Sequence, residues 1–336
     1  MAGKAEKGIY AYGAVIMLNY LTAMQAEAQG VQAAADIECI HRMRVASRRL
    51  RAAQEYFDTF LPKKTAIQWE KQIQSITSAL GNARDLDIQI EAIREFQLLN
   101  NEDKCQPGYK RLILRLSQKR NQAQLNILET LTKLNFNPVI PKVQKELTRS
   151  IDLVRNENLV SIPLRLLAIQ AINEKLTHFL SYESYVHIPE RKLELHAMRI
   201  AAKQLRYTME IFAKIFPGEL KDWLQPIRQA QEQLGEIHDC DMWIDFLPLF
   251  LDSELEMSKK YYGHSRTHYR IIPGIMNFLH NRQNTRIRIY DQFGEFWDSL
   301  QENQLWQRLF NHLSENHPVQ KVNTIQIQRN LSGQEE

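Results

Sequence analysis

The chain has 336 residues, enough to bury a substantial core as one large domain or two of ordinary size. Its 12 Gly and 11 Pro are few, which favours helix, and its net charge of +4 does not indicate a polyanion partner unless the charge is locally clustered. The three cysteines, Cys39, Cys105 and Cys240, are odd in number and form no CxxC pattern, which argues against a disulfide scaffold. We therefore expect free thiols in a reducing compartment, the cytoplasm.

The first predicted helix covers residues 8–30. Two lysines precede an apolar run here, and Ala26 begins an A-x-A sequence that has the form of a signal-peptidase site. The run is too short to span a bilayer, and apolar positions such as Leu18 and Leu21 fit the buried stripe of an amphipathic helix. We expect a core helix and no membrane contact.

The next predicted helix, 36–60, carries the sequence "HRMRVASRRLR", with five arginines, one histidine and no acid. Residues on a helix advance by about 100°, so one histidine and three arginines fall within about 80° of one another. Met43, Ala46 and Leu50 gather on the opposite side. The cationic face, called here the first basic stripe, consists of His41, Arg44, Arg48 and Arg51.

The rest of the first half is predicted to contain helices at 66–80, 86–99 and 107–134. Pro62 and Gly81 are expected to mark helix ends. A segment with two prolines, "NFNPVIPK", then breaks the pattern, and we expect a partly helical linker over 138–159.

The second half repeats the first. Its "HAMRIAAKQLR" begins at His196, and the same helical arithmetic defines a second basic stripe. Gly235 is expected to end a helix as Gly81 does. A tail over 313–336, rich in Gln, Asn and Ser, is expected to be mobile. The helices of this half are predicted at 163–181, 189–215, 220–234, 240–258 and 266–300. The second basic stripe consists of His196, Arg199, Lys203 and Arg206.

A second motif confirms the tandem duplication: "LGNARDLD" from Leu80 matches "LGEIHDCD" from Leu234. No stretch alternates like a strand, so the prediction is an all-α protein. We expect two tandem helical bundles, residues 8–137 and 160–312, related by a pseudo-twofold axis around a basic central cavity.

The two stripes are candidates for anion binding. The stretch 41–51 contains no acid to neutralise its cations, and like charges one turn apart repel one another. The second copy keeps the stripe cations, whereas the flanking Arg42 and Arg49 are replaced by Ala197 and Gln204. A polyanion held between two facing stripes would meet cations on both sides.

The doubled pattern H-x-M-R-[VI]-A-x-[RK]-x-L-R with LG-x-x-[RH]-D-x-D resembles the CHAD domain, the conserved-histidine α-helical domain. The resemblance covers residues 8–312. It implies two helical-bundle halves with a basic cavity that binds inorganic polyphosphate, and association with polyphosphate granules. Carried over by position, the binding residues are His41, Arg44, Arg48, Arg51, His196, Arg199, Lys203 and Arg206. It implies no cofactor, metal or catalysis, and Gln204, opposite Arg49, predicts weaker binding by the second half.

Further cations and two acids are candidates for supporting roles. The aspartates of the D-x-D motif cannot share one helix face, so we do not expect a paired acid and base. One of each pair is expected to cap the following helix, and the other to hold a stripe arginine in place. The additional anion contacts are Arg42, Arg49, Arg115, Lys119, Arg282 and Arg286, and the supporting acids are Asp85 and Asp239.

Two alternative functions stay open. His238-Asp239 resembles the His-Asp pair of helical metal-dependent phosphohydrolases of the HD type, but the first copy has Arg84 in place of the histidine. RNA or another nucleic acid is also a polyanion, although it calls for aromatic side chains among the cations, and of the stretches that carry the stripes only the second offers one, Tyr207.

Overall fold

The computed structural model describes residues 4–34, 36–57, 61–135, 137–154 and 160–315. Across these ranges the regular structure is α-helix with two short 3₁₀ turns, and no strand occurs in them. The prediction of an all-α fold is therefore confirmed. None of the described helices is both long and apolar enough to cross a membrane.

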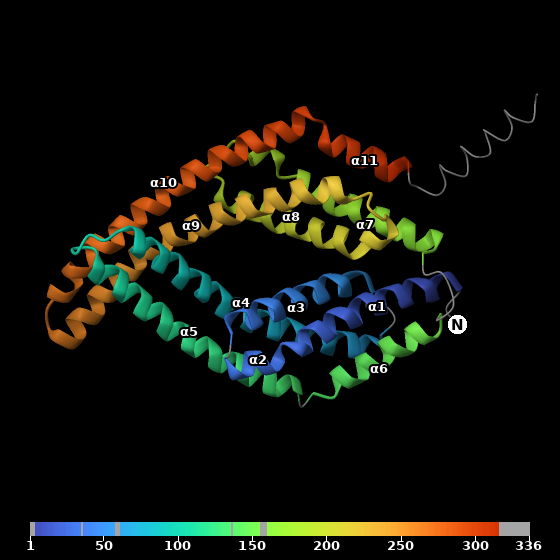
Figure 1. Cartoon of the computed structure of the whole chain (residues 1–336), viewed down its shortest axis with the longest axis horizontal. Coiled ribbons are helices and arrows are strands. Elements are labelled where there is room, and N and C mark those ends of the chain that lie inside the picture. The colour runs from blue at the N-terminus through green and yellow to red at the C-terminus, as the bar shows by residue number, and fades with distance from the viewer. Residues whose placement is uncertain (1–3, 35, 58–60, 136, 155–159, 316–336) are drawn as a thin grey trace, which may run out of the picture.

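The helices form two groups that follow the two halves of the sequence (Figure 1). The first group is α1 (Lys4–Ala26), α2 (Ala28–Ala33), α3 (Ile37–Phe57), α4 (Lys63–Leu99), α5 (Gln106–Asn135) and α6 (Val139–Asp152). The second group is α7 (Ile162–Leu180), η2 (Glu183–Tyr185), α8 (Lys192–Phe212), η3 (Ala213–Ile215), α9 (Lys221–Tyr262), α10 (Arg266–Glu302) and α11 (Leu305–Glu315). The pseudo-twofold relation between the groups stays a prediction.

Two predicted helix ends, at Gly81 and Gly235, were wrong. Both glycines lie inside long helices, α4 and α9, which pass through the D-x-D motif without a break. A Cβ atom at Gly81 would lie 3.7 Å from Nε of Arg44, and one at Gly235 would lie 4.0 Å from Cδ of Arg199. A glycine in a helix costs about 1 kcal/mol relative to alanine. Both are ordinary van der Waals distances, so a side chain at either position would touch a stripe arginine without displacing it.

The predicted linker and the start of the predicted tail both contain helix. In the predicted linker 138–159, α6 covers Val139–Asp152 and buries Val143 and Leu147, so this part of the segment belongs to the packed core. The predicted mobile tail begins three residues too early, because α11 extends to Glu315 and Leu313 is buried. The remainder of that tail, 316–336, lies outside the described residues.

An aromatic cluster joins the two halves. Phe57 of α3 and Phe212 of α8 occupy matching positions in the repeat, and their ring centroids are 5.9 Å apart. The hydroxyl of Tyr12 on α1 donates to the carbonyl of Ile211, at 2.7 Å. Ends of matching helices therefore pack on each other, which fixes α3 beside α8.

A close crossing of α5 and α10 makes a second junction. A Cβ atom at Gly108 would lie 2.4 Å from the carbonyl oxygen of Ile271, and one at Gly274 would lie 2.1 Å from the carbonyl oxygen of Cys105. No side chain fits at such distances, so these two glycines allow the backbones to touch. The long helices of the two halves are held together at this end of the molecule (Figure 1).

Candidate anion-binding site

The two basic stripes have the orientation that their periodicity predicts. On α3, Met43, Ala46 and Leu50 are buried in the core, while Arg51 on the other face is exposed. On α8, Met198 and Leu205 are fully buried. The apolar face anchors each helix, and the arginines and lysine of the opposite face are left at the surface between the halves.

Cations from both halves line two adjoining cavities of about 400 Å³ each. Arg44 and Arg48 of α3 belong to both cavities. One cavity adds Arg51 from the same helix and Lys203 from α8. The other adds Arg199 from α8 and Arg282 from α10. Tertiary structure therefore brings five of the eight stripe residues, together with Arg282, to one hollow region.

The cations in this region repel one another. The pKa of Lys203 falls to about 7 because protein atoms remove water from the ammonium group and because Arg48, Arg199, Arg44 and Arg206 lie near it. Burial likewise lowers the pKa of Arg44, with Arg48 acting in the same direction. Burial also lowers the pKa of Arg199. Such a concentration of like charge favours any anion that enters.

The histidines of the stripes lie beside the cavities and are not among the residues that line them. Burial lowers the pKa of both His41 and His196, and the nearby Arg84 and Arg199, respectively, add to the effect. Nδ1 of each ring is buried and has no hydrogen-bond partner among the described residues. The ring of His196 lies 4.1 Å from that of His238, which does line one cavity.

A carboxylate of its own helix compensates the charge of Arg206. Arg206 lies 3.5 Å from Glu210, one turn further along α8, and Arg49 of α3 contacts the same carboxylate at 3.0 Å. Arg206 and Arg49 therefore share one acid across the junction, outside both cavities. Glu55, one turn after Arg51, pairs instead with Lys175 at 2.6 Å.

The aspartates of the two D-x-D motifs divide into two kinds, and none caps a helix because α4 and α9 are continuous. Asp85 and Asp239 line a cavity, and Asp85 lies 3.2 Å from Nη2 of Arg44. The pKa of Asp239 rises to about 6 because surrounding protein disfavours its charge, an effect that Arg199 partly offsets.

The second aspartate of each motif is buried against an arginine of the closing helix. Asp87 accepts from Nε of Arg120 at 2.7 Å, and Asp241 accepts from Nε of Arg286 at 2.6 Å. Both carboxylates are buried. Arg286 also donates to the carbonyl of Pro189 at 2.7 Å, so it is engaged within the protein and does not line the cavities.

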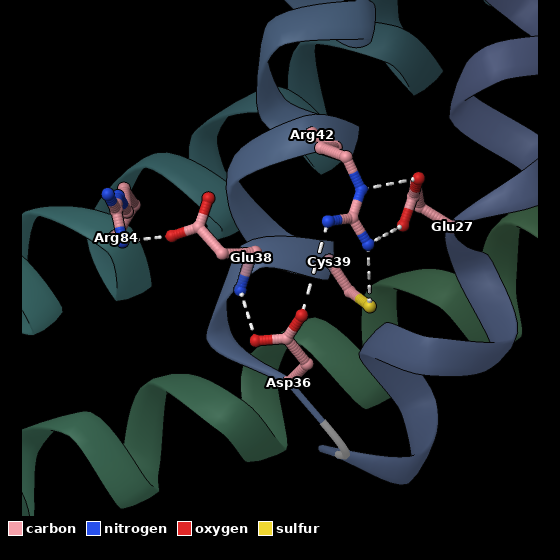
Figure 2. A network of polar contacts seen from close by, with 6 residues as sticks. All are labelled: Glu27, Asp36, Glu38, Cys39, Arg42 and Arg84. Atoms are coloured by element: carbon pink, nitrogen blue, oxygen red, sulfur yellow. Dashed lines mark hydrogen bonds and ion pairs between the residues drawn. The ribbon is translucent and has the colours of Figure 1, made fainter.

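The flanking Arg42 belongs to a separate surface network (Figure 2). Its Nε and Nη2 donate to the two carboxylate oxygens of Glu27 at 2.8 and 2.9 Å, and Nη2 lies 3.3 Å from the sulfur of Cys39. Glu38 of the same network lies 3.5 Å from Nη1 of Arg84. Figure 2 shows Arg42 turned toward α1, and the two cavities do not include it.

Of the predicted cations on the closing helices, Arg282 alone lines a cavity of the site. Arg115 pairs with Glu254 at 2.5 Å, and the ammonium of Lys119 lies 5.2 Å from the centre of the Phe246 ring. Sequence reasoning missed Ser78 and Thr285, whose hydroxyl groups line the cavities. Their only sequence signal is spacing: Ser78 lies three residues before Gly81, and Thr285 three residues after Arg282.

Comparison with known proteins supports this architecture. The CHAD domain family model matches residues 15–248. The chain is similar to the crystal structure of the CHAD domain from the plant Ricinus communis, with 18% identity, a TM-score of 0.60, and coverage of 86% of this chain and 91% of that one. It is also similar to PptA from Streptomyces chartreusis, with 12% identity, a TM-score of 0.58, and coverage of 85% and 98%. No curated protein matches the chain.

Proposed function

The chain belongs to the CHAD domain family, and we propose that its facing basic stripes bind inorganic polyphosphate without catalysing a reaction on it. The polymer would lie along the two adjoining cavities, in contact with α3 and α8 together. The residues assigned to it are those of the stripes that line the cavities, with Arg282 from α10. This role covers recognition, storage or localisation of the polymer.

One observation carries the proposal: Arg44 and Arg48 line both cavities, and each cavity receives further cations from the opposite half. A flexible chain of phosphates needs cations at successive positions, and such an arrangement supplies them. Arginine contacts phosphate oxygens bidentately, and lysine acts as a mobile point charge. Release of condensed counterions, known from nucleic acids, would add affinity and make it fall steeply with salt.

The electrostatics of the empty cavities favour the same ligand. The pKa of Lys203 falls to about 7, chiefly because burial disfavours its charge and also because four arginines lie near it. A phosphate chain would offset that repulsion and favour the charged ammonium. Part of the binding free energy would therefore come from relief of repulsion between α3 and α8.

The rival functions have weaker support. For nucleic acid, stacking would depend on Tyr207, which lines one cavity, and on Trp243, which lines the other but is buried. For an HD-type phosphohydrolase, His238 stacks beside His196 in a strongly cationic setting, and its pKa falls to about 4, chiefly through burial. Within the described ranges, no group of three or more His, Cys, Asp or Glu side chains is arranged to hold a metal ion.

We propose further that the protein acts in the cytoplasm. Association with polyphosphate granules, or with proteins that metabolise the polymer, follows from the proposed ligand. The proposed location rests on the three free cysteines, and the proposed association rests on the family resemblance and the basic cavities.

Calorimetric titration with long-chain polyphosphate tests the proposal. The double variant Arg44→Ala/Arg199→Ala should keep the fold and bind at least about a hundredfold more weakly, since charge-assisted hydrogen bonds contribute about 1.5–3 kcal/mol each. The control Arg42→Ala/Arg308→Ala removes the same charge from exposed positions, so its affinity should change by less than about threefold.

Three outcomes would overturn the assignment. Unchanged affinity in the Arg44→Ala/Arg199→Ala variant would remove the site. Tighter binding of single-stranded RNA than of polyphosphate at equal salt would favour the nucleic-acid alternative. Release of orthophosphate in the presence of a divalent metal would favour the hydrolase.

A further inference from the structure

A separate polar cavity lies where the end of α9 and the start of α10 meet the first half of α5. The turn between α9 and α10 forms one tip of the molecule (Figure 1). The cavity has a volume of about 310 Å³ and shares no lining residue with the two cavities of the basic stripes. The proposed polyphosphate site therefore does not account for it.

The sequence of this tip combines cations with aromatic rings. Residues 259–270, "KKYYGHSRTHYR", contain four Lys or Arg, three Tyr, two His and no acid. Tyr261 and Tyr262 are 70% and 60% exposed, yet both line the cavity. Lys259, Lys260 and Arg266 are exposed on the same turn. Aromatic side chains among cations, almost lacking on the basic stripes, are thus present here.

The floor of the cavity is a built polar site. Glu254 is buried and lies 2.5 Å from Nε of Arg115 and 3.5 Å from Nε of Arg111, so two guanidinium groups share one carboxylate. His268 is 8% exposed, and its Nδ1 has no hydrogen-bond partner among the described residues. A buried ring nitrogen without a partner is costly unless a ligand or water satisfies it.

We propose that this cavity binds a phosphorylated nucleoside. The base would stack on the ring of Tyr261 or Tyr262, and the phosphate would take the excess positive charge of Arg111 and Arg115. His268, which also lines the cavity, would contact the base or sugar. The volume is at the lower end of the range for small-ligand pockets, which suits one nucleoside unit.

The same chemistry has two sources, a free nucleotide or one unit of a single strand. The exposed cations of the tip would contact neighbouring phosphates of a strand, and base stacking on aromatic rings is the usual means of holding single-stranded nucleic acid. A free nucleotide would use the cavity alone. The experiment below separates the two.

Calorimetric titrations of the full chain with four probes test the proposal: AMP, adenosine, ribose 5-phosphate and an eight-nucleotide oligoadenylate. Adenosine lacks the phosphate and ribose 5-phosphate lacks the base, so each should bind at least about tenfold more weakly than AMP. Tighter binding of the oligonucleotide than of AMP would identify a strand as the source, and equal binding per site would identify a free nucleotide.

Variants locate the ligand. Tyr261→Ala and Arg111→Gln should each weaken AMP binding by about tenfold or more. Tyr269→Ala is the matched control, because this tyrosine is 65% exposed on the same tip but does not line the cavity, and AMP binding should change by less than twofold. Thermal unfolding followed by circular dichroism should show the same midpoint for all three variants.

Several results would overturn the proposal. One is the absence of any heat of binding with AMP or the oligonucleotide at millimolar concentration. The others are equal affinity for ribose 5-phosphate and AMP, and equal losses of AMP affinity in Tyr261→Ala and Tyr269→Ala. Polyphosphate binding distinguishes this cavity from the two cavities of the basic stripes. Tyr261→Ala should leave polyphosphate affinity unchanged, and Arg44→Ala/Arg199→Ala should leave AMP affinity unchanged. Failure at one site therefore says nothing against the other.

Discussion

The two halves of the chain keep the same framework but build their share of the site from different groups. In each half, the second aspartate of the D-x-D motif is buried against an arginine of the closing helix, at 2.7 Å in the first and 2.6 Å in the second. In each half, a glycine inside the long helix lies beside a stripe arginine. Both halves have therefore kept the ion pair that joins the long helix to the closing helix.

The cations themselves differ. Arg48 and Arg84 of the first half are matched by Lys203 and His238 of the second. Arginine stays charged at every physiological pH, whereas the pKa of Lys203 falls to about 7 and that of His238 to about 4. At these two matched positions the first half therefore carries permanent charges, whereas the charges of the second half depend on pH. After duplication, the charged groups of the two halves have therefore changed while the helices that carry them have stayed the same.

The largest expected effect tests the shared framework. Asp87→Ala and Asp241→Ala should each lower the free energy of unfolding by about 3 kcal/mol or more, because each leaves a largely buried arginine without its carboxylate. Denaturant unfolding measures the loss. Asp85→Ala is the control: its carboxylate is 61% exposed, so the loss should be about 1 kcal/mol or less. A large loss in only one half would show that the framework is not shared.

The next effect tests the difference in charge. The pKa of Lys203 is lowered to about 7, so the free site carries this charge below pH 7 and loses it above. A polyanion prefers the protonated form, so affinity for polyphosphate should fall about tenfold between pH 6.5 and pH 8.5.

Calorimetry at constant salt measures this fall, and Lys203→Arg should remove most of it because arginine does not titrate in this range. The matching change in the first half, Arg48→Lys, should not reduce the pH dependence of polyphosphate affinity. A pH dependence that persists in Lys203→Arg would contradict the role of Lys203.

The smallest effect concerns the acids at the cavity wall. Asp85 lies 3.2 Å from Arg44 and competes with the ligand for it, while the matching Asp239 makes no ion pair within 4.0 Å among the described residues. Asp85→Asn should therefore raise affinity for polyphosphate by about threefold, since exposed ion pairs contribute about 0.2–1 kcal/mol. Asp103→Asn, in an exposed loop, is the control. Weaker binding in Asp85→Asn would instead assign this acid to positioning Arg44.

Much of the fold could be predicted because helical periodicity is a local property. The buried Met43 and Leu50 and the opposite arginines follow from a rotation of about 100° per residue. The continuation of α4 through Gly81 and of α9 through Gly235 could not be predicted from the sequence. A glycine lowers helix propensity without forbidding helix, and packing decides whether the helix continues. Here each glycine lies beside a stripe arginine that is about 40 residues away in the sequence.

The residues that line the candidate site could be predicted from the sequence only in part. Charge and repetition predicted Arg44, Arg48 and Arg199, which line the cavities, whereas Arg42 and Arg115, also predicted as anion contacts, do not line them. Their partners, Glu27 and Glu254, come from other helices, and the pattern of one helix does not show which acids another presents. The polar cavity at the α9–α10 tip went unnoticed for the same reason.

By itself, the sequence determined the duplication, the helical class and the two faces of α3 and α8, since each depends on residues within a few turns of one another. Tertiary structure decided which cations remain available to a ligand. An arginine beside a carboxylate and an arginine in a cavity have the same sequence signature. Only the packing of helices from both halves, through Phe57 on Phe212 and Gly108 on Gly274, sets which carboxylates come within reach and where water and anions can enter.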